Sequence, residues 1–285
     1  MLPAIFGSSV AQINILLSGV IASLLGVGSI SYLYYSDRLM EFPLGLFGIA
    51  LATVTLPYLS RLWATEDREA FSSTLDCALK LSLLIAIPAA LGLFVVSDGL
   101  VATLFFRGEF DGHAVQMTSL ALKAYALGLV GFSLVKILAP AYFAREDTRT
   151  PVRIGIYALL LNLLLSVVVA WLLTRSGYPA PHIALAGATS VAALLNAALL
   201  YIGLKRIQVL AHGAGWAVFL FRLVLANAAM CAILFWLHKP LDWWLAVGFW
   251  ERAGWLLTAI ASAAGTYAVL LFLSGVRPAT LRLKA

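Results

Sequence analysis

The sequence YYSDRLMEFP, residues 34–43, places charged side chains inside a long apolar run that begins near Leu2. If this stretch is helical, four side chains spaced i, i+3, i+4 and i+7 share one face: Tyr34, Asp37, Arg38 and Glu41. Charged groups are unfavourable against lipid, so the face is expected to look into protein or into water. The alternative is that it is simply a wet part of a membrane span, with Arg38 reaching the lipid headgroups.

The composition is that of a membrane protein. Hydrophobic residues make up 62% of the 285 residues, charged residues make up 11%, and the mean hydropathy is +0.98. A soluble domain carries about 25% charged residues, so a polytopic membrane protein is predicted. The net charge of +6 does not indicate nucleic-acid binding, because the Lys and Arg residues are dispersed among short loops.

The apolar runs predict an all-α bundle of about eight transmembrane helices. A single helix from Leu2 to Glu41 would be about 60 Å long, against a hydrocarbon core of about 30 Å. A break is therefore expected at Gly26-Val27-Gly28, with a break at Pro43 as the alternative. The predicted spans are 2–25, 29–62, 75–97, 117–143, 152–173, 183–204, 216–237 and 250–273. Kinks are expected at Pro43 and Pro88.

The connections suggest two units. Residues 97–116 are predicted to form the longest connection between spans, and residues 207–215 are a plausible boundary. This boundary divides the chain into a six-helix unit, residues 1–206, and a two-helix appendage with a short basic tail, residues 207–285. Small residues are expected to let helices pack closely at two places: Gly45, Gly48 and Ala52, and Gly128 and Gly131.

Several polar side chains fall inside predicted spans. Gln12 and Asn14 lie in the first span, Lys136 in the fourth, and Asn162 in the fifth, one turn from Ser166. Each is a candidate for lining a polar cavity. The alternatives are hydrogen bonds to neighbouring helices for the amides and a headgroup contact for the lysine.

No metal or cofactor site is predicted. The histidines stand singly in loops or at span ends, and no pair has the spacing of metal ligands: His113, His182, His212 and His238. Cys77 and Cys231 lie in apolar runs and are expected to be small core residues. There is no nucleotide loop or Ser–His pair, so an enzyme is not expected. The first residues lack the basic segment and cleavage site of a signal peptide.

The basic residues favour one side of the membrane. One side collects Arg61, Arg68, Lys80, Arg145, Arg149, Arg153, Lys205, Arg206, Arg277, Arg282 and Lys284; the other collects Arg38, Arg107, Lys123, Arg175, Lys239 and Arg252. By the positive-inside rule the first side is cytoplasmic. Both ends of the chain are then cytoplasmic, and the face from Asp37 to Glu41 lies toward the outer half of the bilayer.

Two stretches carry a family resemblance. YYSDRLMEFPLGLFGIALATVTLPYLSR (34–61) and LAPAYFAREDTRTPVRI (138–154) resemble the MurJ (MviN) lipid II flippase family, which belongs to the multidrug/oligosaccharidyl-lipid/polysaccharide exporter superfamily. The resemblance covers essentially the whole chain and is to the C-terminal portion of the family: the second six-helix lobe and two further helices. It implies that Met1 starts a fragment and that the N-terminal lobe is a missing partner.

The resemblance also implies a function. The family moves lipid II, the lipid-linked peptidoglycan precursor, across the bacterial inner membrane by alternating access. The family's functional arginine corresponds to Arg38, which would bind the pyrophosphate, with Tyr34, Asp37 and Glu41 beside it. Asp37 would hold Arg38 in place when no substrate is bound; in the alternative, Glu41, three residues from Arg38, is its structural partner. The last two helices resemble the family's groove for the polyprenyl tail, in contact with membrane lipids.

Some family members hold a sodium ion through carboxylates on the first and fifth helices of this lobe. Here the comparable depths offer only neutral side chains, so no sodium site is predicted: Ser18, Asn162, Ser166 and Thr189. Other functions remain open. One is another exporter of the superfamily, marked by buried acidic residues outside the Asp37–Glu41 face, and another is an inactive fragment or scaffold. A membrane enzyme acting on polyprenyl phosphates would need clustered acidic or histidine ligands at one membrane face.

Overall fold

The computed structural model describes residues 2–210 and 215–275, with side chains described throughout except at 2–11 and 47–54. Within this part of the chain every regular element is a helix. Some sequence-based expectations concern residues outside this part of the chain: His212, Arg277, Arg282, Lys284 and Ala285. The close packing expected at Gly48 and Ala52 falls in the stretch whose side chains are not described.

Membrane-length helices dominate the described residues. Six are long and apolar enough to cross a bilayer: α4 (Arg68–Phe105), α5 (Gly112–Phe143), α6 (Arg149–Arg175), α7 (Ile183–Arg206), α8 (Trp216–Trp236) and α10 (Phe249–Leu273). Two further rods precede them. One is α1 (Leu2–Ser23), and the other is the nearly continuous run of α2 (Ser29–Pro43), η1 (Leu44–Ile49) and α3 (Ala50–Ala64). The predicted all-α membrane bundle is therefore confirmed; a short helix, α9 (Leu241–Ala246), was not expected.

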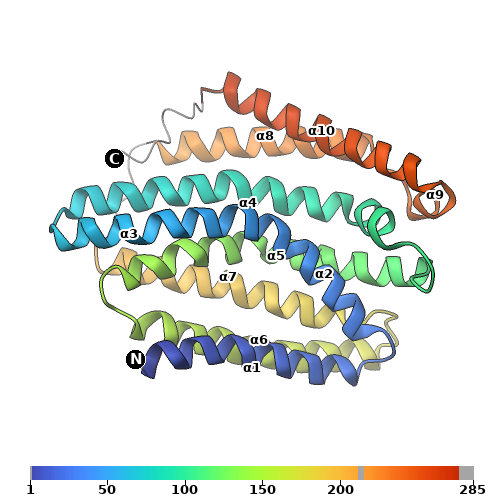
Figure 1. Ribbon diagram of the computed structural model, residues 1–285, viewed down its shortest axis with the longest axis horizontal. Helices are drawn as coiled ribbons and strands as arrows, with labels where there is room; N and C mark the ends of the chain where they lie inside the picture. Colours follow the sequence, from blue (N-terminus) through green and yellow to red (C-terminus); the bar gives the residue numbers. More distant parts are fainter. Residues whose placement is uncertain (1, 211–214, 276–285) are drawn as a thin grey trace.

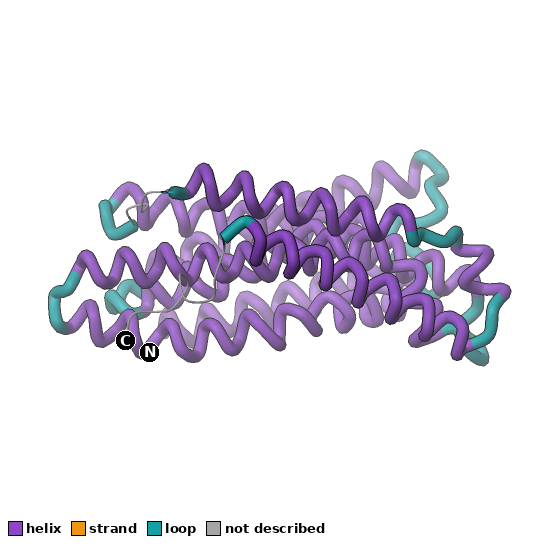
Figure 2. Tube along the Cα trace, turned by 90° about the horizontal axis from the view of Figure 1, so that it is seen from above, coloured by secondary structure: helices purple, strands orange, loops and turns teal. Residues whose placement is uncertain are grey.

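The helices lie side by side along the longest dimension of the molecule (Figure 1). In a view turned by 90°, most loops again gather at the two ends (Figure 2). We call one the basic end, which holds the turns 65–67 and 144–148 and residues 207–210 after α7. The other is the aromatic end, which holds the turns 24–28, 106–111 and 176–182 and the α8–α10 connection with its tryptophans.

Helix α5 is the centre of the bundle. It packs against α4, α7, α2 and α3, whereas α8 and α10 pack on each other and on α4, and α1 packs mainly on α6. Two glycines allow α5 to approach α7 closely. A Cβ added at Gly128 would lie 2.6 Å from the Ser190 Cα, and one at Gly131 would lie 2.7 Å from the Ala193 carbonyl carbon. The predicted packing role of both glycines is thus confirmed.

The break between the first two spans falls where the glycines predict it. Helix α1 ends at Ser23 and α2 begins at Ser29. Between them Gly26 has φ +127° and Gly28 has φ +88°, which other L-residues rarely adopt. Pro43 does not end the rod. Instead the six-residue π-helix η1 follows it directly, so the chain continues into α3 with altered hydrogen bonding.

The expected long connection at 97–116 is wrong. Helix α4 continues to Phe105 and α5 already begins at Gly112, which leaves only residues 106–111 between them. The polar residues misled the prediction, because Asp98 is not in a loop but inside α4, where it pairs with Lys123 of α5 at 2.9 Å. Asp111 caps α5 by accepting a hydrogen bond from the Ala114 amide at 2.8 Å.

Helix α4 is longer than its predicted span at the basic end too. It begins at Arg68 rather than near residue 75, because Asp67 caps it by accepting from the Ala70 amide at 2.9 Å. Asp76 and Lys80, spaced i and i+4 near the start of α4, form an ion pair, with Asp76 Oδ2 2.7 Å from Lys80 Nζ. Asp76 Oδ1 also accepts from the Trp216 indole at 2.6 Å, which ties the start of α8 to α4.

Candidate functional site

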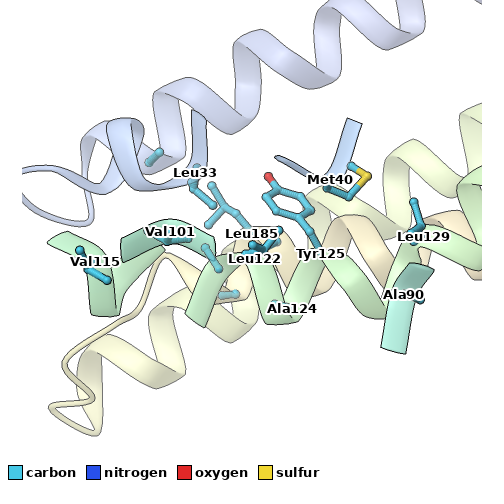
Figure 3. Packing of buried hydrophobic residues seen from close by; sticks show 14 of the residues in the cluster. Leu33, Met40, Ala90, Val101, Val115, Leu122, Ala124, Tyr125, Leu129 and Leu185 are labelled. Atoms are coloured by element: carbon cyan, nitrogen blue, oxygen red, sulfur yellow. The ribbon is translucent and has the colours of Figure 1, made fainter. Parts of the chain in front are cut away.

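The rotation of α2 about its axis is set by what it buries. Leu33, Ser36 and Met40, spaced i, i+3 and i+7, are 8%, 0% and 4% exposed. Leu33 and Met40 lie beside Leu122 and Tyr125 of α5 in the main hydrophobic cluster (Figure 3). Because this side of α2 is fixed against α5, the opposite side is turned outward.

The outward side of α2 carries three of the four predicted side chains. Arg38 Nη1 donates to Glu41 Oε2 at 2.7 Å, and the Arg38 Cζ lies 5.1 Å from the centre of the Tyr34 ring. The side chains of Arg38 and Glu41 are 57% and 49% exposed. The guanidinium is therefore held by one carboxylate and one aromatic face, and its outward N–H groups can still bind an anion.

Asp37 occupies a different place from the other three residues. It is half-buried and makes no hydrogen bond or ion pair with any described residue, and it lies near Tyr125 of α5. The alternative in which Asp37 holds Arg38 is wrong, and Glu41 is the partner. The reason is geometric: an i+3 neighbour lies on the same helix face, whereas adjacent residues point in different directions.

Arg38 also lines a large groove of about 840 Å³. The groove lies between α2, α4, α8 and α10, and its lining includes Phe42 and Pro43 of α2, Leu93 of α4 and Met230 of α8. Arg38 is the charged residue of this lining, and apart from Tyr267 its other side chains are apolar. The sequence linked the last two helices to an apolar groove but did not place Arg38 in it. The groove is built by α2, α4, α8 and α10, and the sequence does not show that these distant helices meet.

Two other predicted residues form a hydrogen-bonded cluster across three helices. Asn162 Nδ2 of α6 donates to Asn14 Oδ1 of α1 at 2.6 Å. Asn162 Oδ1 accepts from Ser166 and from Thr189 of α7, each at 3.4 Å. The amides thus join helices, which was the alternative to a cavity role. These neutral groups satisfy one another and do not fit a sodium site built on carboxylates.

The remaining predicted cavity residues are not part of this cluster. Gln12 of α1 and Lys136 of α5 are both exposed and make no hydrogen bond or ion pair to other described residues. The ion pair between Asp98 and Lys123 was missed, since Asp98 was placed in the predicted 97–116 connection and Lys123 in the predicted span 117–143. Asp98, whose side chain is 16% exposed, is a partly buried acidic residue outside the Asp37–Glu41 face, and Lys123 neutralises it.

Burial lowers the pKa of two side chains outside the spanning helices, Arg145 and His182. At the basic end, the Trp63 ring has the Arg68 Cζ 3.2 Å and the Arg145 Cζ 4.8 Å from its centre. Burial lowers the pKa of Arg145, and nearby Arg68 lowers it further. At the aromatic end, His182 Nε2 donates to the Met117 carbonyl at 3.0 Å, and burial lowers the pKa of this histidine.

Comparison with known proteins gives one consistent result. A sequence model described as "Lipid II flippase MurJ" matches residues 1–252. The chain is 45% identical over 279 residues to a protein of Vibrio cholerae named "Probable lipid II flippase MurJ", covering 97% of this chain and 51% of that protein. The chain therefore spans about half the length of this relative.

Solved structures show the same likeness in three dimensions. The structure titled "Lipid II flippase MurJ, inward closed conformation" matches with a TM-score of 0.77 at 26% identity, covering 94% of this chain and 52% of that one. A multidrug resistance MATE family transporter of the MOP superfamily, in an outward-facing conformation, matches with a TM-score of 0.60 at 16% identity over 95% of this chain and 63% of that one. The second match shows a shared fold alone.

Proposed function

This chain belongs to the MurJ family of lipid II flippases, and from that membership we propose that it forms the lobe of a transporter that binds a lipid-linked pyrophosphate and moves it across a membrane. Lipid II is the proposed substrate. The relatives that match are named as flippases, which are transporters and not enzymes.

One observation carries the proposal: a single arginine lines an otherwise almost wholly apolar groove. A lipid-linked precursor has an anionic head and a long hydrocarbon tail, so its site needs a cation next to an apolar surface. The Arg38 guanidinium stays charged at any depth and matches the oxygens of a pyrophosphate through paired N–H donors. The groove between α2, α4, α8 and α10 offers the tail its surface.

Glu41 gives Arg38 a resting partner that a headgroup can displace. The pair is half-exposed, so an incoming pyrophosphate reaches the guanidinium without opening the protein core. Tyr34 holds the guanidinium over its ring during the exchange. Asp37, turned toward α5, is proposed to add negative charge behind the site and so to favour release of the anion. Gln12 and Lys136, both exposed, are proposed to line the polar cavity further along.

The two parts of the chain are proposed to have separate roles. Residues 1–206 form the six-helix lobe that alternates against an N-terminal lobe of the same protein. Residues 207–285 add the α8–α10 pair, which completes the groove on α4. The relatives support a bacterial inner-membrane location, and the Lys/Arg asymmetry supports a cytoplasmic basic end and cytoplasmic termini.

A binding experiment tests the proposal. We expect the chain in lipid nanodiscs to bind undecaprenyl pyrophosphate at least tenfold more tightly than either undecaprenol or inorganic pyrophosphate, because only the whole lipid uses both Arg38 and the groove. Native mass spectrometry with each ligand in turn measures this. Arg153→Ala, which removes an exposed charge at the basic end, serves as the control and should leave binding unchanged. Equal binding of undecaprenol and the pyrophosphate lipid would rule the proposal out.

Orientation has its own test. In a chain with Cys77 and Cys231 replaced by serine, we expect Glu109→Cys to react with an impermeant maleimide added outside intact cells, and Arg149→Cys to react only after lysis. Both positions are exposed, at opposite ends of the bundle. Gly112 at the start of α5 is less suitable than Glu109 for a cysteine substitution, since a Cβ there would lie 2.8 Å from the Leu245 side chain. Labelling in the reverse pattern would overturn the orientation.

A further inference from the structure

A side-chain hydrogen bond joins α10 to α4 inside the membrane. Tyr267 Oη donates to the Leu84 carbonyl oxygen at 2.6 Å. Tyr267 is half-buried, and its ring packs against a small cluster that includes Val95 of α4 and Met230 of α8. The contact thus links the α8–α10 pair to the six-helix unit through a polar group in apolar surroundings.

The Leu84 carbonyl is available because of Pro88. In a regular α-helix the amide of residue 88 would donate to the carbonyl of residue 84, but proline has no N–H to donate. Helix α4 nevertheless runs on through Pro88 from Arg68 to Phe105. A backbone carbonyl left without a donor is unfavourable in the hydrocarbon region, and the Tyr267 hydroxyl supplies the donor that Pro88 lacks.

This contact lies at one end of the groove that Arg38 lines. Leu84, Pro88 and Tyr267 all belong to its lining, and Leu84 is the lining residue of α4 nearest the basic end. Toward the aromatic end the same two helices are tied again, where Arg252 Nη1 of α10 donates to the Ala102 carbonyl of α4 at 3.0 Å. Between these ties the lining of α4 and α10 is apolar, so only packing holds the two walls there.

We infer that Tyr267 is a positioning residue that fixes α10 on the carbonyl freed by Pro88 and thereby sets the separation of the groove walls that receive a long hydrocarbon chain. The identity of that hydrocarbon chain rests on the proposed function. The hydrogen bond from Tyr267 to the Leu84 carbonyl, which we call the clasp, is independent of the proposed function. Tyr267 acts through the placement of α10, and its hydroxyl is occupied by the protein itself.

The first test measures the clasp without any lipid ligand. In a background lacking Cys77 and Cys231, spin labels at Gly92 of α4 and Ala264 of α10 report the distance across the groove by double electron–electron resonance. We expect Tyr267→Phe, which removes only the hydroxyl, to broaden and lengthen the distance distribution. Tyr157→Phe is the matched control, because Tyr157 is exposed on α6 and makes no described hydrogen bond. An unchanged distribution in Tyr267→Phe would overturn the inference.

A double-mutant cycle separates the clasp from a general packing effect. Pro88→Ala restores the amide that can satisfy the Leu84 carbonyl within α4. We therefore expect Tyr267→Phe to change the distance distribution much less in the Pro88→Ala background than in the parent. Equal changes in the two backgrounds would contradict the assignment, because they would show that the hydroxyl does not act through that carbonyl.

The second test asks whether the clasp positions a long chain. We expect Tyr267→Phe to weaken binding of undecaprenyl pyrophosphate roughly two- to tenfold, the range that one hydrogen bond supplies. Binding of a short-chain farnesyl pyrophosphate should change less, because it covers less of the groove. Equal weakening for both lipids would overturn the positioning role. If the parent chain binds neither lipid, the proposed function fails, whereas the spin-label distances still report the clasp.

Discussion

Arg38→Ala is expected to abolish lipid translocation while leaving the amount of protein in the membrane unchanged. The setting is a two-lobe transporter assembled from this chain and the first lobe of the Vibrio cholerae relative. Arg38 and Glu41 are both about half exposed, so removing the guanidinium leaves Glu41 in contact with solvent and not stranded in a core. Loss of activity would then report a lost headgroup contact. Membrane abundance by immunoblot and flipping of labelled lipid II are measured on the same samples.

Two companion variants sharpen this experiment. Arg38→Lys keeps the charge but loses the planar pair of donors, so partial transport is expected. The double variant Arg38→Ala, Glu41→Gln is expected to stay inactive, because removing the resting partner does not restore a group that binds pyrophosphate. If the double variant transports normally, Arg38 serves only to neutralise Glu41, and the proposed headgroup contact is wrong. A fall in abundance for Arg38→Ala alone would lead to the same conclusion.

The second large effect concerns the lobe by itself. Residues 1–285, expressed alone, are expected to insert into membranes but not to restore growth to cells depleted of their lipid II flippase. The chain spans about half of its relatives, and alternating access needs two units that move against each other. Co-expression with the first half of the relative is expected to restore growth. Rescue by residues 1–285 alone would show that the first lobe is not needed as a partner.

Local contacts were the ones that the sequence could predict. Arg38 and Glu41 are three residues apart and Asp76 and Lys80 four, so helical spacing alone brings each pair together. The break at Gly26-Val27-Gly28 followed from length, because one helix could not fit the bilayer. The spacing did not settle which carboxylate Arg38 would choose, since Asp37 and Glu41 are both close in sequence.

Contacts between distant helices were not predictable in the same way. Asn14 and Asn162 are 148 residues apart, and Leu84 and Tyr267 are 183 apart. Both could be suspected, one from a polar residue within a span and the other from a proline within a helix, but neither partner could be named. Asp98 and Lys123 are 25 residues apart, and their pairing was missed because Asp98 was assigned to the 97–116 connection, where charge was taken as a sign of solvent. In a helical bundle, an opposite charge on the neighbouring helix can stabilise a charged side chain in place of solvent.

The π-helix η1 has a consequence for how this rod is compared with other sequences. A regular α-helix advances about 100° in azimuth per residue, and i+5 hydrogen bonding accommodates roughly one residue more per turn. The face that carries Arg38 and the face of α3 beyond Ile49 are therefore out of phase on a helical wheel drawn with a constant angle. Because η1 already accommodates about one extra residue, deleting one residue within 44–49 and restoring a regular α-helical turn would leave the azimuth of Arg38 relative to α3 nearly unchanged. A one-residue gap in this hexapeptide when homologues are aligned is therefore compatible with the same direction of the guanidinium relative to α3, whereas a one-residue gap in the regular helix on either side would turn it by about 100°.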